Sequence, residues 1–211
     1  MLNIDTYRDL KKKIIINERG EELVFLDEFF SRFLPHPYLE VGAPYAEKSP
    51  FFVRKEVLKR LYVAQSKLES LNKGFKLKVF DAYRPLAVQK YMIEYDTKRY
   101  GKKITQKFWS PISTDVKLSP PPHSTGGALD LTIIDKNGLE LDMGTKIDEF
   151  TESSYSNFNA ISSTCRDNRA LLLEVMTFAG FSQLPTEWWH FSFGDQIWAI
   201  DNNTYAKYGL I

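Results

Sequence analysis

A proline-rich segment between Lys107 and Pro122 limits the folds open to this chain more than any other feature of its sequence. It contains Pro111 and three consecutive prolines at 120–122, so it can form neither the interior of a helix nor a central strand. It leads directly to His123, which we expect it to present from a stiff, extended loop. Regular secondary structure is therefore expected before and after this segment.

The chain before this segment mixes helical and strand patterns. From Val53 to Leu71 apolar residues recur at intervals of three and four, which predicts an amphipathic helix. Residues 77–80 predict a short strand, and a second helix is expected from Leu86, just after the turn at 81–85. The three isoleucines at 14–16 predict an early strand.

The chain after the prolines favours paired strands. Residues 128–134 are apolar and β-branched enough for a central strand, and Asn137-Gly138 then gives the strongest short signal for a β-hairpin. A helix is expected from Thr164 to about Gly180, and a last strand over 188–193. The sequence therefore predicts an α+β fold, a single domain over residues 1–211 with a central, mainly antiparallel sheet flanked by helices.

Composition excludes several classes of function. The chain has 28 Lys and Arg against 27 Asp and Glu, so no overall basic charge points to a nucleic acid or membrane partner. Its one cysteine, Cys165, cannot form an intramolecular disulfide or a cysteine-rich metal cluster. No secretory signal and no apolar run long enough to span a membrane is recognisable, so we expect a cytoplasmic protein.

Two short segments hold two of the three histidines, each with a carboxylate nearby. The first runs from His123 to Asp130, and the second from Glu187 to His190. Two imidazoles and one carboxylate, with a second carboxylate to spare, are the side chains of a catalytic zinc site: three ligands, one open position and a general base. Either spacing alone arises by chance, but the pair is more specific.

The expected strands set geometric conditions for such a site. On a strand over 128–134, Asp130 faces away from Leu129 and Leu131, and a charge among apolar neighbours needs a partner or a metal. Gly126-Gly127 lets the chain bend back from His123. Glu187 is an odd number of residues from His190, so it must lie in a bend after Pro185 to reach the same side.

A zinc ion held by His123, Asp130 and His190 would lower the pKa of a bound water to about 7, and Glu187 could then accept its proton. Arg84, at a strand-to-helix turn, is the candidate for stabilising an oxyanion. Simpler interpretations stay open. The histidines could be core residues that bind no zinc, and Arg84 could be an ion-pair partner of Asp81 without a catalytic role. His36, between two prolines, is expected to be a loop residue without a role.

Four segments in this order resemble the D-alanyl-D-alanine dipeptidase family, which includes the vancomycin-resistance dipeptidases. They are residues 79–85 (VFDAYRP), 123–132 (HSTGGALDLT), 143–145 (MGT) and 187–191 (EWWHF). The resemblance extends over about residues 38–198. It implies a zinc peptidase fold related to the D,D-carboxypeptidases and to the hedgehog domain.

The resemblance implies one zinc per chain, bound by His123, Asp130 and His190, with Glu187 as general acid and base and Arg84 polarising the scissile carbonyl. It places Asp148 where the family has a carboxylate for the amine of the substrate. Tyr83 and Trp189 are further candidates for lining the pocket. Two departures concern recognition of the substrate carboxylate: Pro121 stands where the family usually has Ser, and Thr125 where the resistance enzymes tend to have Arg.

The function expected from the resemblance is hydrolysis of D-alanyl-D-alanine or a similar small dipeptide, in recycling or removal of cell-wall precursor. A D,D- or L,D-carboxypeptidase acting on peptidoglycan stem peptides is one alternative. The other is a hedgehog-like module that keeps zinc for structure and binds a partner without catalysis. Glu187 and Arg84 argue against this last alternative, because a structural zinc site requires neither.

Overall fold

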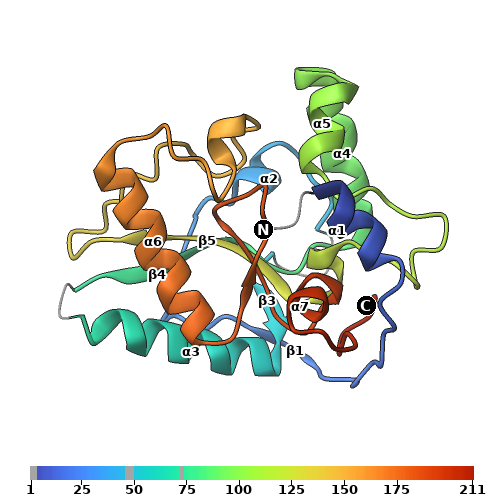
Figure 1. Ribbon diagram of the computed structural model, residues 1–211, viewed down its shortest axis with the longest axis horizontal. Coiled ribbons are helices and arrows are strands. Elements are labelled where there is room, and N and C mark those ends of the chain that lie inside the picture. The colour runs from blue at the N-terminus through green and yellow to red at the C-terminus, as the bar shows by residue number, and fades with distance from the viewer. Residues whose placement is uncertain (1–3, 46–49, 72–73) are drawn as a thin grey trace.

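The computed structural model describes residues 4–45, 50–71 and 74–211 (Figure 1). The helices are α1 (Ile4–Lys11), α2 (Pro37–Glu40), α3 (Lys55–Glu69), α4 (Leu86–Tyr100), α5 (Lys102–Phe108), α6 (Ser163–Phe178) and α7 (Gln196–Asp201), with 3-10 helices η1 (Pro122–Thr125) and η2 (Glu152–Ser154). The strands are β1 (Leu23–Phe25), β2 (Ser31–Arg32), β3 (Phe52–Arg54), β4 (Lys76–Asp81), β5 (Ala128–Ile134), β6 (Ser182–Gln183) and β7 (His190–Ser192).

A five-stranded sheet in the order β2-β4-β5-β7-β6 forms the centre of the molecule. Only the edge pair β2–β4 is parallel, and the other three pairs are antiparallel. β1 and β3 form a separate antiparallel pair. The predicted α+β fold with a mainly antiparallel sheet is therefore confirmed, and β5 occupies the predicted residues 128–134 at its centre.

Helices α3 and α6 cover one face of this sheet (Figure 1). The apolar positions of α3 that the sequence identified, among them Leu61 and Leu68, are fully buried there. They belong to one core cluster with Leu129, Leu131 and Ile133 of β5. Because side chains alternate along a strand, Asp130 faces the opposite side, as predicted.

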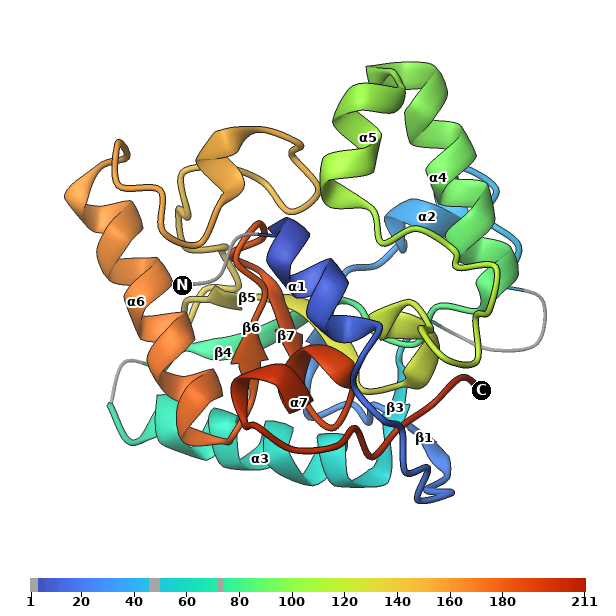
Figure 2. The same cartoon turned by 45° about the vertical axis from the view of Figure 1, so that its right-hand side comes forward.

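The opposite face of the sheet carries a second, more aromatic cluster. Phe80 of β4 packs there with Tyr38 of α2, Val88 and Met92 of α4, and Trp109. Helices α4 and α5 lie on the side of the molecule away from α3 (Figure 2), and the side chains of β5 that face away from α3 and α6, Asp130 and Thr132 among them, are buried. Polar groups on this face of β5 are consequently removed from bulk water.

Local signals failed where short elements depend on distant contacts. The predicted strand at 14–16 is reduced to one bridge between Ile16 and Ala206, while α1 precedes it. Residues 188–193 contribute only the three residues of β7. The return strand after Asn137-Gly138 is a single bridge, Ile134 to Glu140. Within the described ranges, no helix combines the length and apolar character needed to cross a membrane.

Candidate metal centre and its cavity

Three polar side chains lie in a row across the sheet, on the face turned away from α3 and α6. In the strand register Asp81 of β4 lies opposite Asp130 of β5, and Asp130 lies opposite His190 of β7. The pairing of β4 with β5 shifts between Val79 and Asp81, and irregularities of this kind re-aim side chains next to functional sites. Strand pairing alone thus brings Asp130 and His190 together.

His123 reaches the same place from the 3-10 helix η1, so the predicted extended loop was wrong. Pro122 begins this turn, where a missing N–H costs little, and Gly126 ends it with a φ of 71°. At Gly127 an added Cβ would lie 2.6 Å from the carbonyl oxygen of Phe193. The glycine pair therefore allows the sharp return from His123 into β5 that the sequence predicted.

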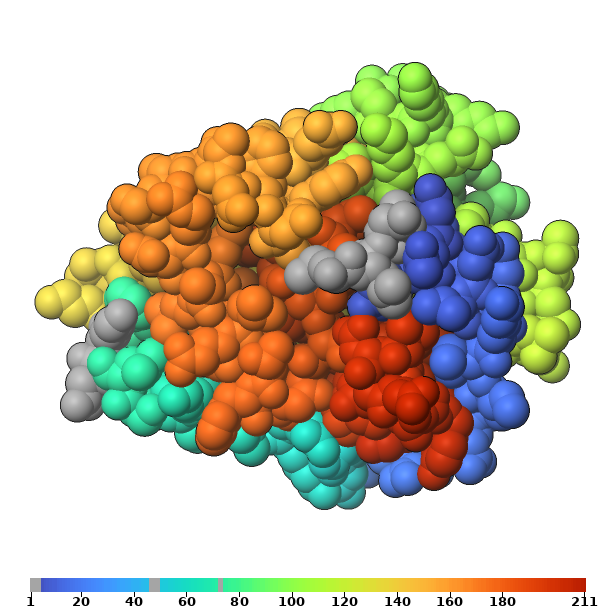
Figure 3. Space-filling view, viewed as in Figure 1, coloured from blue at the N-terminus to red at the C-terminus, as the bar shows by residue number. Residues whose placement is uncertain are grey.

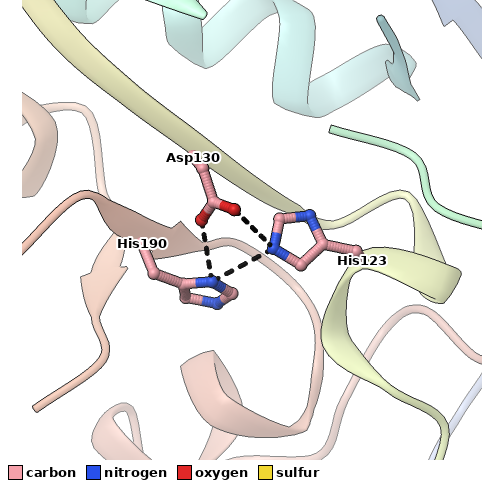
Figure 4. Close-up of side chains that lie close together, drawn as sticks. All are labelled: His123, Asp130 and His190. Atoms are coloured by element: carbon pink, nitrogen blue, oxygen red, sulfur yellow. Dashed lines mark hydrogen bonds and ion pairs between the residues drawn. The ribbon is translucent and has the colours of Figure 1, made fainter. Parts of the chain in front are cut away.

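His123, Asp130 and His190 bring three potential ligand atoms together (Figure 4). Nε2 of His123 lies 3.2 Å from Nδ1 of His190 and 3.3 Å from Oδ2 of Asp130. Nδ1 of His190 lies 3.1 Å from Oδ1 of Asp130. In a tetrahedron with such edges the centre is about 2.0 Å from each corner, the usual zinc–ligand distance. The spacing and chemistry of these donors therefore fit a zinc ion.

The other nitrogen of each imidazole has an acceptor of its own. Nδ1 of His123 is 2.7 Å from the carbonyl oxygen of Ala82, and Nε2 of His190 is 3.2 Å from Oγ of Ser192. The Ser192 hydroxyl in turn donates to Asp195. With protons on these two ring nitrogens, the nitrogens that face the cluster keep free lone pairs, as metal ligands require.

Three carboxyl groups, those of Asp130, Glu187 and Asp148, line the same cavity. Burial opposes ionisation of Asp130, but the imidazoles of His123 and His190 outweigh it and hold the pKa of Asp130 far below its usual value. Burial, and after it the charge of Asp130, raises the pKa values of both Glu187 and Asp148, which share its cavity. A divalent cation among these carboxylates would offset their mutual repulsion.

Glu187 lies in the turn that follows Pro185, three residues before the start of β7. Its Oε2 is 3.8 Å from Nδ1 of His190, so the geometric condition set by the sequence is met. Burial, followed by the charge of Asp130, raises the pKa of Glu187 well above its usual value, while Arg84 opposes the shift. A buried carboxyl with a raised pKa, next to the ligand cluster, is suited to accept and release a proton.

Arg84 is held rigidly at the turn between β4 and α4. Its Nε and Nη2 both contact Oδ2 of Asp81, at 2.8 and 2.7 Å, and Nη1 donates to Gln89 at 3.1 Å. Nη2 also lies 3.5 Å from Oδ2 of Asp130. The ion pair with Asp81 is therefore present, and the same guanidinium borders the ligand cluster.

Asp148 enters the cavity from the loop after Met143. Its backbone has a positive φ of 61°, and its Oδ2 accepts a hydrogen bond of 2.6 Å from the Tyr38 hydroxyl. Burial and then the charge of Asp130 raise the pKa of Asp148 to about 8, although the Tyr38 hydrogen bond and Arg84 oppose this. A cationic group that approaches this carboxyl would stabilise its ionised form.

One cavity of about 70 Å³, counted as space for the centre of a water-sized sphere, joins these groups. A single water needs about 10–15 Å³ on this measure, so the cavity suits a small molecule. Tyr83 and Trp189, which the sequence suggested as substrate contacts, are buried but are not among its lining residues. The aromatic side chains of Tyr38 and Trp109 line the cavity instead.

Tyr38 and His36 also contribute to the site although no sequence pattern pointed to them, and Asp81 was named only as a possible partner of Arg84. Tyr38 contacts Asp148 and, at 3.3 Å, Arg84. His36 was expected to lack a role, yet it is buried, it caps α2, and its Nε2 lies 3.5 Å from Oδ1 of Asp81. Only the spacing of Asp81 and Arg84 around one turn hinted at their pairing, because the other contacts cross long stretches of chain.

Curated relatives resemble this chain over much of its length. The D-alanyl-D-alanine dipeptidase of Synechocystis sp. (strain ATCC 27184 / PCC 6803 / Kazusa) is 37% identical, over 90% of this chain and 89% of its own. Proteins of the same name from Escherichia coli (strain K12) and Enterococcus faecium are 35% and 30% identical, over 56% and 58% of this chain and 55% and 64% of their own.

A family model also matches the chain. It describes the D-ala-D-ala dipeptidase peptidases of group M15, and the match runs over residues 44–209. The matched range includes η1, β5 and the turn before β7, and therefore every side chain of the ligand cluster. The chain belongs to the M15 D-ala-D-ala dipeptidase family.

Proposed function

We propose that residues 1–211 act as a single zinc peptidase domain that hydrolyses D-alanyl-D-alanine or a similar small dipeptide, with one zinc ion bound by His123, Asp130 and His190. The observation that carries this proposal is that three ligand atoms with tetrahedral spacing, a buried carboxyl and a fixed guanidinium line one small cavity. The names of the curated relatives and of the family support the substrate class.

When bound, a zinc ion supplies a Lewis acid and a water whose pKa is lowered. Glu187, beside His190, takes the proton of the attacking water and passes it to the leaving amine. Arg84, fixed by Asp81 and Gln89, donates to the oxyanion that develops on the scissile carbonyl. Because the guanidinium is held before substrate arrives, little reorganisation is needed in the transition state.

Asp148 binds the free amine of the dipeptide in this proposal. We expect Asp148→Asn to raise KM for the free dipeptide about 10- to 100-fold, because a charge-assisted hydrogen bond is lost. An N-acetylated dipeptide should be cleaved equally by both proteins. Asn tolerates the positive φ of 61° at this position, so the backbone is preserved. Steady-state kinetics with both substrates measures the difference.

A matched control for this variant is Glu149→Gln. Glu149 is the neighbouring residue, and its exposed side chain accepts a hydrogen bond from the backbone N–H of Lys146. This variant should leave KM for the free dipeptide unchanged. If Asp148→Asn affects blocked and free dipeptides alike, Asp148 does not recognise the amine.

The size of the cavity favours a dipeptidase over a carboxypeptidase. If the amine binds at Asp148, a longer peptide would have to extend past the contact between Tyr38 and Asp148. A binding module without catalysis would not require Arg84 to be fixed next to the ligands. Peptidoglycan metabolism and a cytoplasmic location stay predictions from the resemblance and the sequence.

A panel of substrates tests the proposed function. The zinc-loaded protein is incubated with D-Ala-D-Ala, L-Ala-L-Ala, mixed-chirality dipeptides and a stem pentapeptide ending in D-Ala-D-Ala, and products are separated by chromatography. We expect rapid cleavage of D-Ala-D-Ala and little release of D-Ala from the pentapeptide. Preferential trimming of the pentapeptide would support the carboxypeptidase, and no cleavage of any member would contradict the proposal.

A further inference from the structure

Helix α1 forms a wall of the cavity that the family match, which begins at residue 44, does not include. Tyr7 packs with Leu184 and Ile197 and donates a hydrogen bond to Asp201 of α7. Arg8 donates to the carbonyl oxygen of Gln106, at 2.7 Å, near the end of α5. Figure 3 shows α1, in dark blue, at the surface between the green α4–α5 region and the red C-terminal segment. The helix is thus fixed on both sides.

Lys11, the last residue of α1, places a buried ammonium group at this wall. Lys11 is 8% exposed, and its Nζ donates to the carbonyl oxygen of Pro120 at 2.6 Å. In the described part of the chain, no ion pair joins this Nζ to a carboxylate. Burial lowers the pKa of Lys11 to about 8, against the charge of Asp195. A buried cation without a counterion gains free energy from binding an anion.

The other groups at this wall are less available to an anion. Arg8 donates to the carbonyl oxygens of Gln106 and Lys107 and lies 3.8 Å from Asp5. The neighbouring prolines at 120–122 have no backbone N–H to offer. Lys11 Nζ uses one of its three donors on Pro120 and keeps two. It is therefore the donor best able to bind an anion here.

Lys11 and Asp148 line the same cavity but contact different neighbours. Nζ of Lys11 donates to the carbonyl oxygen of Pro120, whereas Oδ2 of Asp148 accepts from the Tyr38 hydroxyl. In the described part of the chain no ion pair joins the two side chains, so the cavity has an ammonium and a carboxyl to offer to the two ends of a zwitterion.

We propose that Lys11 of α1 binds the free C-terminal carboxylate of the dipeptide, an inference that rests on the proposed function. One end of the substrate then meets Asp148 and the other meets Lys11, with the scissile bond between them beside Arg84. An N-terminal helix of this chain thereby selects for substrates that end at this carboxylate.

The test compares a free acid with its neutral amide. We expect the wild-type protein to cleave D-Ala-D-Ala much faster than D-Ala-D-alaninamide. Lys11→Met, which keeps an unbranched side chain only one atom shorter and without charge, should lower kcat/KM for the free acid about 10- to 100-fold, the usual range for losing a charge-assisted hydrogen bond. Its kcat/KM for the amide should equal that of the wild type, so the preference for the acid is lost.

Lys12→Met is the matched control, because Lys12 is the next residue, is exposed and pairs with Asp9 at 3.2 Å. It should leave both substrates unaffected. An equal loss on acid and amide in Lys11→Met would mean that Lys11 only supports the fold and would overturn the inference, as would an unchanged rate on the acid. If the wild type cleaves neither substrate, the proposed function itself fails.

A binding measurement separates affinity from catalysis. In a Glu187→Gln background, where turnover is slow, calorimetry gives Kd for the acid and the amide. Adding Lys11→Met should weaken binding of the acid and leave binding of the amide unchanged. The same weakening for both ligands, or no weakening of the acid, would contradict the role of Lys11. Thermal unfolding verifies that both proteins are folded.

Discussion

Replacing Glu187 with Gln should abolish most of the activity while leaving the metal in place. Glu187 lies 3.8 Å from Nδ1 of His190 but outside the group of three ligand atoms. Gln has the same size and cannot accept a proton, so the change removes proton transfer alone. We expect kcat to fall about 10²- to 10⁴-fold, the range found for general acid–base catalysis, with zinc content unchanged.

The same variant should be at least as stable as the wild type when both are metal-free. The folded-state pKa of Glu187 lies above its unfolded value because of burial and the charge of Asp130. A carboxyl of this kind lowers stability as pH rises from its unfolded pKa to its folded pKa. Gln removes that cost near neutral pH, and denaturant unfolding measures the gain. Loss of zinc together with activity would instead make Glu187 a ligand.

Replacing Arg84 should have the second large effect. Two variants distinguish the contribution of its charge from that of its planar, forked shape. In Arg84→Lys the positive charge beside Asp81 is kept, but the fork that contacts Asp81, Gln89 and Tyr38 is lost. We expect kcat to fall about 10²- to 10³-fold, as on removal of one oxyanion donor, with a smaller change in KM. Steady-state kinetics over a range of D-Ala-D-Ala concentrations measures both.

Arg84→Ala should add a loss of stability that Arg84→Lys does not. It leaves Asp81, which is fully buried, without its main counterion, although His36 and His123 remain nearby. Breaking a buried ion pair from one side costs about 3–5 kcal/mol, visible in the free energy of unfolding. If Arg84→Lys changes only KM, Arg84 binds the ground state of the substrate and does not stabilise the transition state.

Much of the fold was accessible from the sequence because its largest elements carry their own signals. The periodicity over 53–71 identified α3, and the β-branched run 128–134 identified β5 with its correct boundaries. The sharp turn at the glycines after His123 and the bend after Pro185 were also predictable. Only a turn could return the chain from His123 to Asp130, and only a bend could bring Glu187 to the same side as His190. These signals sufficed to predict that the two histidine segments meet.

The remaining parts depend on contacts between distant residues. Helix α1 is short and polar, and its position depends on contacts with α7 and α5 that no local pattern encodes. Tyr38 reaches Asp148 across 110 residues, and Lys11 reaches Pro120 across 109. Tyr83 and Trp189 were named for their chemical type beside the motifs; both are buried, and neither is among the residues that line the cavity.

The metal content of the purified protein tests the central claim most directly. We expect protein prepared without chelators to contain about one zinc ion per chain by mass spectrometry of metals, to lose activity on chelation and to regain it with zinc. His190→Ala should hold far less zinc, because it removes one of three ligands. Well under one zinc per chain in active wild-type protein, or undiminished zinc in His190→Ala, would contradict the account.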